Sequence, residues 1–308
     1  MPKILVSVML VSAMLLAGCS SAPKRAADTR PQRPREAVRI FDREGRPTEW
    51  EIMRGDLAHA DVIVIGETHG HPLGLEAAAC LWDDLLATEP NAALALEFFE
   101  RDEQVAIDDY LSGVIEKEED FRKASGRTPG NYPEGHRRMV ESARAAHRPV
   151  IAANAPRRYV RRAGADGYDD VASLSAEQKR LFALPDPLVE GAYRERFNKL
   201  MAEGGHGSDE QGMSQEMIDR MYHSQQMWDA TMADSIVRAV HAGNRPVVLV
   251  VGRFHSDFDG GTVQLMRRAE PDLQIRTLSM VASDAEAIED EDVGRADYVV
   301  YVGKAPER

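Results

Sequence analysis

The segment Val62-Ile-Val-Ile-Gly66-Glu67-Thr68-His69 decides the fold. Four consecutive β-branched residues are typical of a strand that is buried on both faces, because a strand with one wet face alternates apolar and polar residues. A second segment, Val248-Leu-Val-Val-Gly252-Arg253-Phe254-His255, repeats the arrangement. A strand followed by Gly-x-x-His therefore occurs twice, and the sheet is expected to consist of two related halves whose glycines allow tight turns close to a ligand.

Other short apolar runs lie on either side of these two segments, and longer amphipathic segments separate them. Continuous apolar strands that alternate with helices are typical of a parallel sheet covered on both faces. The sequence thus predicts an α/β fold, with a mostly parallel sheet and helices on both faces. The predicted strands cover residues 61–66, 92–98, 149–154, 246–252, 273–280 and 298–302.

About ninety residues separate the third and fourth predicted strands, which is more than one crossover needs. Apolar residues recur there at helical spacing, and a Gly-rich break follows at 203–208. This pattern predicts a small, all-helical subdomain inserted at about 170–240. Its expected helices cover residues 175–182, 187–201 and 214–241.

Polar side chains gather where the predicted strands end. In open parallel sheets, ligands bind outside the carboxyl ends of the strands, where loops and helix N-termini converge. We therefore expect one strand-end site, organised by buried hydrogen bonds. Its members are Glu67, His69, Glu97, Asn154 and His255.

The N-terminal segment indicates export. Lys3 precedes an apolar run of about a dozen residues, and Leu16-Ala17-Gly18-Cys19 matches the bacterial lipobox, in which the cysteine is acylated, as with palmitate. A plain signal peptide or a short membrane helix is the alternative, although the run is shorter than the ~20 residues that span a bilayer. Residues 1–18 are thus predicted to be a lipoprotein signal peptide, 19–37 a flexible tether and 38–308 the folded domain. Ser20 after the cysteine favours the outer membrane over other parts of the bacterial envelope.

Composition excludes several classes of protein. The chain has 308 residues, of which 43% are hydrophobic, so it can form a real core. Its 38 basic and 51 acidic side chains give a net charge of −13. Because wrapping a nucleic acid needs a contiguous basic face, we expect no nucleic-acid partner.

The motifs resemble those of a known family. The chain is similar to the ChaN-like haem-binding lipoproteins of the haem-binding uptake and Tiki superfamily, which also includes relatives of Tiki proteases and erythromycin esterases. The resemblance implies an α/β domain with a helical subdomain, haem in a pocket that a second subunit can complete, and a role in iron acquisition. It runs in order over roughly residues 50–281 and is carried by Gly66-Glu67-x-His69, Glu97 with Arg101-Asp102-x-Gln104, Asn154-Ala-Pro-Arg157, Gln226-x-Trp228-Asp229-x-x-Met232-Ala233 and Gly252-x-x-His255.

Given that resemblance, ferric haem needs an axial ligand, and Tyr phenolate or His imidazole can supply it. Tyr159 is the first candidate, because its neighbours form a local cationic cluster that would pair with propionates and lower the pKa of a nearby phenol. The alternative is a solvated helix face with Tyr159 packed in the core. The expected propionate contacts are Arg157, Arg158 and Arg161.

Three further residues are candidate haem ligands. His206 lies in the Gly-rich loop, where it is either a ligand, from this subunit or a partner, or an ordinary exposed histidine. Tyr222 and His223 follow on the last predicted helix. Neighbouring helical positions point about 100° apart, so only one of these two can face a given pocket.

An enzyme is the competing hypothesis. Glu67, His69, Glu97 and His255 are residue types from which a general acid/base pair is built, and His69 with His255 could hold a divalent metal. The family's relation to proteases and esterases favours a metal-dependent hydrolase of this kind. A tethered interaction module, in which the polar strand ends only organise loops, is the third interpretation.

Overall fold

The computed structural model describes residues 34–128, 131–204 and 213–305. Cys19 and His206 lie outside these ranges. Within them, no helix is long and apolar enough to cross a membrane.

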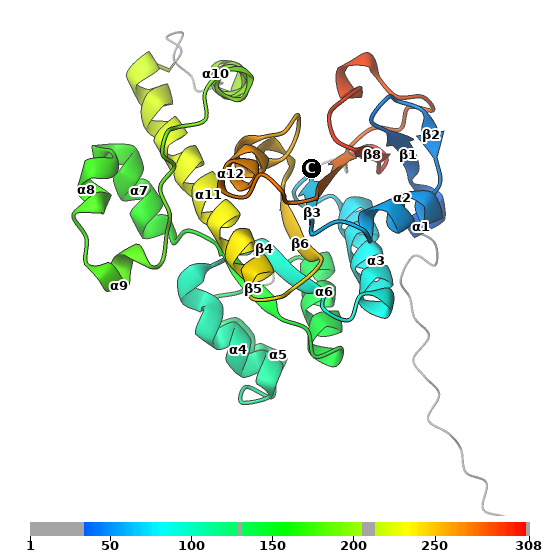
Figure 1. Cartoon of the computed structure of the whole chain (residues 1–308), viewed down its shortest axis with the longest axis horizontal. Coiled ribbons are helices and arrows are strands. Elements are labelled where there is room, and N and C mark those ends of the chain that lie inside the picture. The colour runs from blue at the N-terminus through cyan, green and yellow to red at the C-terminus, as the bar shows by residue number, and fades with distance from the viewer. Residues whose placement is uncertain (1–33, 129–130, 205–212, 306–308) are drawn as a thin grey trace, which may run out of the picture. The chain divides into compact units, whose positions relative to one another are not determined.

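One sheet of eight strands organises the folded part, in the order β2-β1-β8-β7-β3-β6-β4-β5 (Figure 1). Every neighbouring pair from β8 to β5 is parallel, whereas β1 pairs antiparallel with β8 and β2. The predicted α/β class and mostly parallel sheet are confirmed. The strands are β1 (Arg39–Asp42), β2 (Pro47–Thr48), β3 (Val62–Glu67), β4 (Ala93–Glu100), β5 (Val150–Asn154), β6 (Val247–Gly252), β7 (Ile275–Val281) and β8 (Tyr298–Tyr301).

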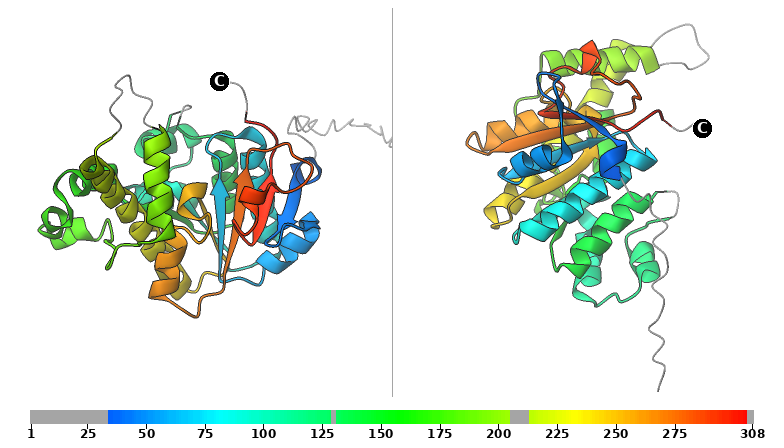
Figure 2. Two further views of the ribbon diagram at one scale, coloured as in Figure 1. Left: turned by 90° about the horizontal axis from the view of Figure 1, so that it is seen from above. Right: turned by 90° about the vertical axis from the view of Figure 1, so that its right-hand side faces the viewer.

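Helices cover both faces of this sheet (Figures 1 and 2). Ile63 and Ile65 of β3 pack in the core beneath α3 (Pro72–Thr88) and α6 (Glu134–Ala145). Val62 and Val64 point the other way, into the core beneath α11 (Gln215–His241) and α12 (Gly261–Ala269). Successive side chains of a strand face opposite sides, so a run of four apolar residues feeds two cores.

All six predicted strands are present, within two residues at each end. The short antiparallel pair β1 and β2 was not predicted, because Arg39-Ile-Phe-Asp42 lacks a β-branched run. The structure also starts earlier than expected: the last four residues of the predicted tether form α1 (Pro34–Ala37), where Arg35 binds Asp84 at 2.6 Å. The other helices outside the helical segment after β5 are α2 (Trp50–Leu57), α4 (Gln104–Ser112) and α5 (Glu118–Ala124).

The segment between β5 and β6 contains only helices among its described residues. Its longest helix, α11, begins at Ser214, whose side chain accepts a hydrogen bond from the N–H of Met217. It packs against both α7 and α12 and so ties the segment to the sheet. The segment comprises α7 (Arg157–Asp166), α8 (Tyr168–Ala172), α9 (Ala176–Lys179), α10 (Ala192–Gly204) and α11. α8 was not predicted, and a helix at α7 was expected only in the alternative interpretation of Tyr159.

Candidate functional site

Three neighbouring strands bring the predicted residues together at their carboxyl ends. Glu67 is the last residue of β3, Glu97 lies in the second half of β4, and His255 ends a short 3-10 turn (Arg253–His255) that follows β6. These strands are adjacent in the order β3-β6-β4. The two Gly-x-x-His motifs therefore place two histidines at the carboxyl end of the sheet.

Glu67 is a buried carboxylate shared by two histidines. Its Oε1 accepts from Nδ1 of His69 at 2.8 Å, and its Oε2 accepts from Nε2 of His136 at 2.6 Å. Burial alone would raise the pKa of this carboxyl, but the charge and hydrogen bonds of the two histidines outweigh burial and lower the pKa to about 2. Glu67 is thus ionised at neutral pH and fixes the ring of His69.

His69 is the exposed member of the site, with 66% of its side chain open to solvent. The hydrogen bond to Glu67 raises its pKa above the ordinary value. Because Nδ1 is engaged by the carboxylate, Nε2 is the nitrogen left for a ligand. An imidazole oriented in this way by a carboxylate is the usual arrangement of metal-bound histidines.

The glycine of the second motif makes room for His69. A Cβ at Gly252 would lie 2.6 Å from Nε2 of His69, closer than such atoms approach. Gly252 φ is −55°, so it needs no left-handed conformation. We expected a tight turn, but the glycine instead permits close approach of a histidine from the neighbouring strand.

His255 is buried between two carboxylates. Its Nδ1 lies 2.7 Å from Oδ1 of Asp229, and its Nε2 lies 3.7 Å from Oε1 of Glu97. Burial lowers the pKa of this imidazole, but Asp229 and Glu97 more than compensate, and the pKa rises to about 9. His255 is therefore an imidazolium at neutral pH, and Tyr193 and Thr262 hold Asp229 through hydroxyl hydrogen bonds of 2.7 Å each.

Glu97 and Asn154 complete the set. Oε2 of Glu97 accepts the backbone N–H of Gly252 at 2.5 Å, which joins β4 to the end of β6. The side chain of Asn154 donates to the backbone carbonyl of Glu97 at 3.1 Å. The predicted residues thus form two sets that meet at Gly252: Glu67 with His69, and Glu97 with Asn154 and His255. Asn154 positions the backbone and does not contribute a free polar atom.

This arrangement supplies proton donors and acceptors side by side: an imidazolium at His255, a carboxylate at Glu97 and an exposed imidazole at His69. Such a set can carry out general acid and base chemistry. Among the residues with described coordinates, no three His, Cys, Asp or Glu side chains are placed to hold a metal ion.

The other candidate haem ligands lie elsewhere. Tyr159 is buried on α7 against Phe182, with ring centroids 5.2 Å apart. Tyr222 is fully buried and donates to the carbonyl of Val189. His223 is half-buried and packs edge-on against Tyr168, and His206 falls outside the described residues. All eight tyrosines of the chain are buried or half-buried. Ligation by Tyr159 or Tyr222 thus stays a prediction that requires the ring to leave its packing.

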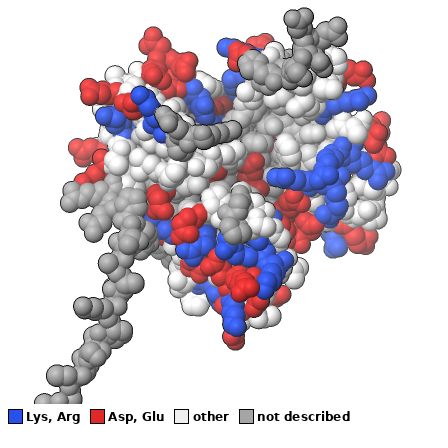
Figure 3. Space-filling view, turned by 180° about the vertical axis from the view of Figure 1, so that it is seen from behind, with Lys and Arg blue, Asp and Glu red and all other residues white. Residues whose placement is uncertain are grey.

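The arginines of α7 do form an exposed basic face (Figure 3). Part of their charge is already paired within the protein: Arg158 binds Asp102 at 2.5 Å, and Arg157 lies 3.7 Å from Glu100. Arg161 is exposed on the same helix. Their role as propionate contacts remains a prediction.

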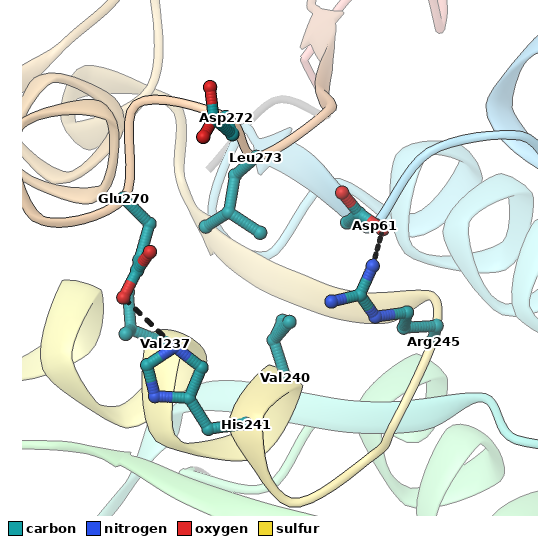
Figure 4. A pocket seen from close by; sticks show the side chains of 8 residues that line it. All are labelled: Asp61, Val237, Val240, His241, Arg245, Glu270, Asp272 and Leu273. Atoms are coloured by element: carbon teal, nitrogen blue, oxygen red, sulfur yellow. Dashed lines mark hydrogen bonds and ion pairs between the residues drawn. The ribbon is translucent and has the colours of Figure 1, made fainter.

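A separate pocket lies at the opposite end of the sheet from the strand-end site (Figure 4). Val237, Val240 and Leu273 line it between two ion pairs, Arg245 with Asp61 and His241 with Glu270. Asp61 and Arg245 precede β3 and β6, so this pocket is at the amino ends of the strands. Its ion pairs are exposed, and it takes no part in the chemistry of the strand-end site.

Sequence reasoning missed His136, Gln225 and Asp229 as members of the site. His136 lies 69 residues from Glu67 on a helix without any motif, so no spacing signals it. Asp229 belongs to the motif Gln226-x-Trp228-Asp229, and a polar residue on the inner face of an otherwise apolar helix was the available signal. Gln225, on the same helix, also contacts His255: its Nε2 lies 3.0 Å from Nδ1 of that histidine.

The family model described as haem-binding uptake, Tiki superfamily, ChaN matches residues 53–266, well over half of the chain. The chain belongs to this family. The resemblance inferred from its motifs is therefore confirmed, and the matched region contains the entire strand-end site. No curated protein matches the sequence.

Solved structures share the fold. The chain is similar to ChaN of Campylobacter jejuni, a structure described as showing cofacial haem binding, with a TM-score of 0.66 and 19% identity over 86% of this chain and 96% of that chain. A mutant erythromycin esterase, EreC in its open conformation, matches with a TM-score of 0.44 and 12% identity over 88% and 84% of the two chains. At 19% identity the likeness to the Campylobacter structure shows the fold alone.

Proposed function

We propose that this protein is a lipid-anchored haem-binding protein of the bacterial envelope that takes part in haem or iron acquisition. Family membership and the haem of the Campylobacter relative support haem as the ligand. The observation that carries the proposal for this chain is the exposed imidazole of His69, oriented by the buried carboxylate of Glu67.

His69 is the proposed axial ligand of the iron. A ligand must reach the haem without unpacking the core, and every tyrosine of the chain is at least half-buried. His255 is a poor ligand because its side chain is only 8% exposed and both ring nitrogens face carboxylates, those of Asp229 and Glu97. The half-buried rings of Phe98, within the last part of β4, and of Phe254, just after β6, suit the apolar porphyrin. Haem would bring an iron that accepts a nitrogen lone pair.

Titration with haemin tests this assignment. His69→Ala should lower haemin affinity roughly ten- to a hundredfold and abolish the imidazole-type spectrum. Binding should not vanish, since burying the ring contributes ~25 cal/mol per Å² without ligation. His241→Ala, which removes an exposed carboxylate-paired histidine at the other end of the sheet, is the matched control.

Tyr159→Phe separates this proposal from phenolate ligation. If His69 is the ligand, the Tyr159 variant should bind haemin with the spectrum of the wild type. Loss of a charge-transfer band in Tyr159→Phe, with His69→Ala unaffected, would return the assignment to Tyr159.

The second face of the haem is proposed to be covered by another subunit, since a ligand held by one exposed histidine leaves the opposite axial position open. A pocket completed across a symmetric interface makes dimerisation depend on haem. Sedimentation of the wild type should therefore show a larger species with haemin than without it.

The lipid anchor at Cys19 rests on the lipobox alone. Cys19→Ser should release the exported protein from the membrane, because the acyl chains are the proposed anchor. The expected membrane is the outer one, as judged by Ser20. Fractionation of the Cys19→Ser protein with membranes after a high-salt wash would contradict the anchor, and recovery of the wild type in inner-membrane fractions would contradict the location.

A hydrolase is the second candidate, and one observation favours it: an imidazolium at His255 lies 3.7 Å from the carboxylate of Glu97. In that activity Glu97 would accept a proton from water and His255 would donate one to the leaving group. Hydrolysis of an ester or amide by the purified wild type, lost in Glu97→Gln, would support it over the haem carrier.

A further inference from the structure

A half-buried arginine on α10 lies beside the strand-end site without a carboxylate partner. Arg196 donates from Nη2 to the backbone carbonyl of Asp257 at 3.0 Å. No carboxylate of the described chain lies within ion-pair distance of it. Burial lowers the pKa of this guanidinium. A guanidinium that loses water without a direct ion pair is costly, so an anion bound there would stabilise it.

The charge of Arg196 is compensated only in part, because the nearby carboxylate of Asp257 raises its pKa less than burial lowers it. The carboxylate of Asp257 is taken by others: Ser279 donates to Oδ1 at 2.7 Å, and Arg295 and Arg253 approach Oδ2 at 2.6 and 3.3 Å. Asp292 is in turn bound by Arg295 at 2.6 Å. The cluster thus holds three guanidinium groups, Arg196, Arg253 and Arg295, against two carboxylates.

The position of Arg196 connects it to the site. Tyr193, one turn earlier on α10, donates to Asp229, the partner of His255. Asp257, whose carbonyl Arg196 binds, lies two residues after His255. The guanidinium is also flanked by the rings of Tyr193 and Phe258, at 5.7 and 5.2 Å from their centroids. These rings hold a cation in place while leaving part of its edge free to donate.

The backbone at this place is also unusual. Phe258 and Asp259 have positive φ values of 55° and 51°. Neither is glycine, and L-residues rarely adopt this left-handed conformation because it is strained. This conformation puts the ring of Phe258 between Arg196 and Arg295, 4.8 Å from the latter. The strained segment therefore builds the arginine cluster next to His255.

We propose that Arg196, assisted by Arg253, receives a carboxylate of the ligand bound at the strand ends. The assignment rests on the proposed function, in which that carboxylate is a haem propionate. It moves the propionate contact from α7 to α10. Arg253 is suited to assist because it is more than a third exposed and its bond to Asp257 is long. Arg158, in contrast, is already bound to Asp102 at 2.5 Å.

Haemin and its dimethyl ester, in which both propionates are neutral, are the probes. The wild type should bind haemin roughly ten- to a hundredfold more tightly than the diester, the range expected for a charge-assisted hydrogen bond. Arg196→Gln should bind the two probes about equally, and Arg196→Lys should restore part of the difference. Arg220→Gln, which removes an exposed arginine paired with Glu216 on the neighbouring helix, should behave like the wild type.

The outcomes separate this assignment from the function on which it rests. Equal affinity of the wild type for both probes overturns the assignment without any variant, even if Arg196→Gln fails to fold. An unchanged preference in Arg196→Gln also overturns it, and loss of the preference in Arg158→Gln instead assigns the propionate to α7. Wild-type protein that binds neither probe contradicts both the proposed function and this assignment.

Discussion

The two ends of the sheet carry the same kind of pair in different surroundings. At the carboxyl end, His255 contacts Asp229 at 2.7 Å, and the side chains are 8% and 0% exposed. At the amino end, His241 contacts Glu270 at 2.9 Å, and the side chains are 60% and 39% exposed. The long helix α11 contributes to both, since Asp229 lies in its middle and His241 is its last residue.

Burial decides what each pair can do. An exposed pair in water contributes ~0–1 kcal/mol and is screened by salt. A buried pair interacts more strongly but must be complete, because a lone buried charge is very unfavourable. Charges that the protein buries at such cost are characteristic of functional sites. The contrast therefore favours the carboxyl end as the functional site, although a pocket is also present at the amino end.

Removing one carboxylate at each end tests the comparison most strongly. Asp229→Asn should lower the free energy of unfolding by about 3–5 kcal/mol, because it leaves the charge of His255 and the hydroxyls of Tyr193 and Thr262 poorly matched. Glu270→Gln should cost less than about 1 kcal/mol. Urea denaturation at neutral pH measures both free energies of unfolding. Similar losses at the two ends would contradict the claim that burial makes the Asp229–His255 pair the stronger one.

The pH dependence of stability gives a second test. The folded state raises the pKa of His255 from 6.5 to about 9, so its contribution is complete below pH 6.5 and is lost as the pH rises through 9. The shift corresponds to on the order of 3 kcal/mol. The stability difference between wild type and His255→Gln should therefore shrink by that amount between pH 6 and 9.5. A difference that is constant over this range would mean that His255 is neutral in the folded protein.

The sequence predicted the sheet well and the site in part, for identifiable reasons. Runs such as Val62-Ile-Val-Ile65 define buried strands locally. Parallel strands bring their carboxyl ends to the same end of the sheet. The polar residues at these ends could therefore be grouped without coordinates: Glu67, His69, Glu97 and His255. His136 and Arg196 come from helices whose rotation and contacts depend on packing. Neither has a local signal.

The tyrosine candidates show the opposite limitation. Tyr159 stands next to several arginines in the sequence, which indicates an accessible phenol in a cationic patch. In the structure the ring is buried against Phe182, and the guanidinium of Arg158 lies over it, 4.6 Å from the ring centroid. A cationic neighbour is therefore present, but the accessibility of the phenol depends on packing against Phe182 from a later segment, which no local pattern signals.

The smallest expected effect on stability is that of a substitution at Gly252, within the carboxyl end of the sheet. Gly252→Ala adds one methyl group that would lie 2.6 Å from Nε2 and 2.9 Å from Cε1 of His69. Overpacking of this kind costs about 1–3 kcal/mol, less when the neighbour can move. His69 is exposed, so we expect its ring to swing outward, with a stability loss near the lower limit but a clear loss of haemin affinity.

His69→Ala removes the clash, and the double variant should therefore show no additional loss beyond His69→Ala, as a double-mutant cycle would measure. Gly55→Ala on α2, where nothing lies within 4 Å of the new methyl group, is the matched control and should leave haemin binding unchanged. Additive losses in the cycle would mean that Gly252 acts through the strand end, by way of Glu97, and not through the position of His69.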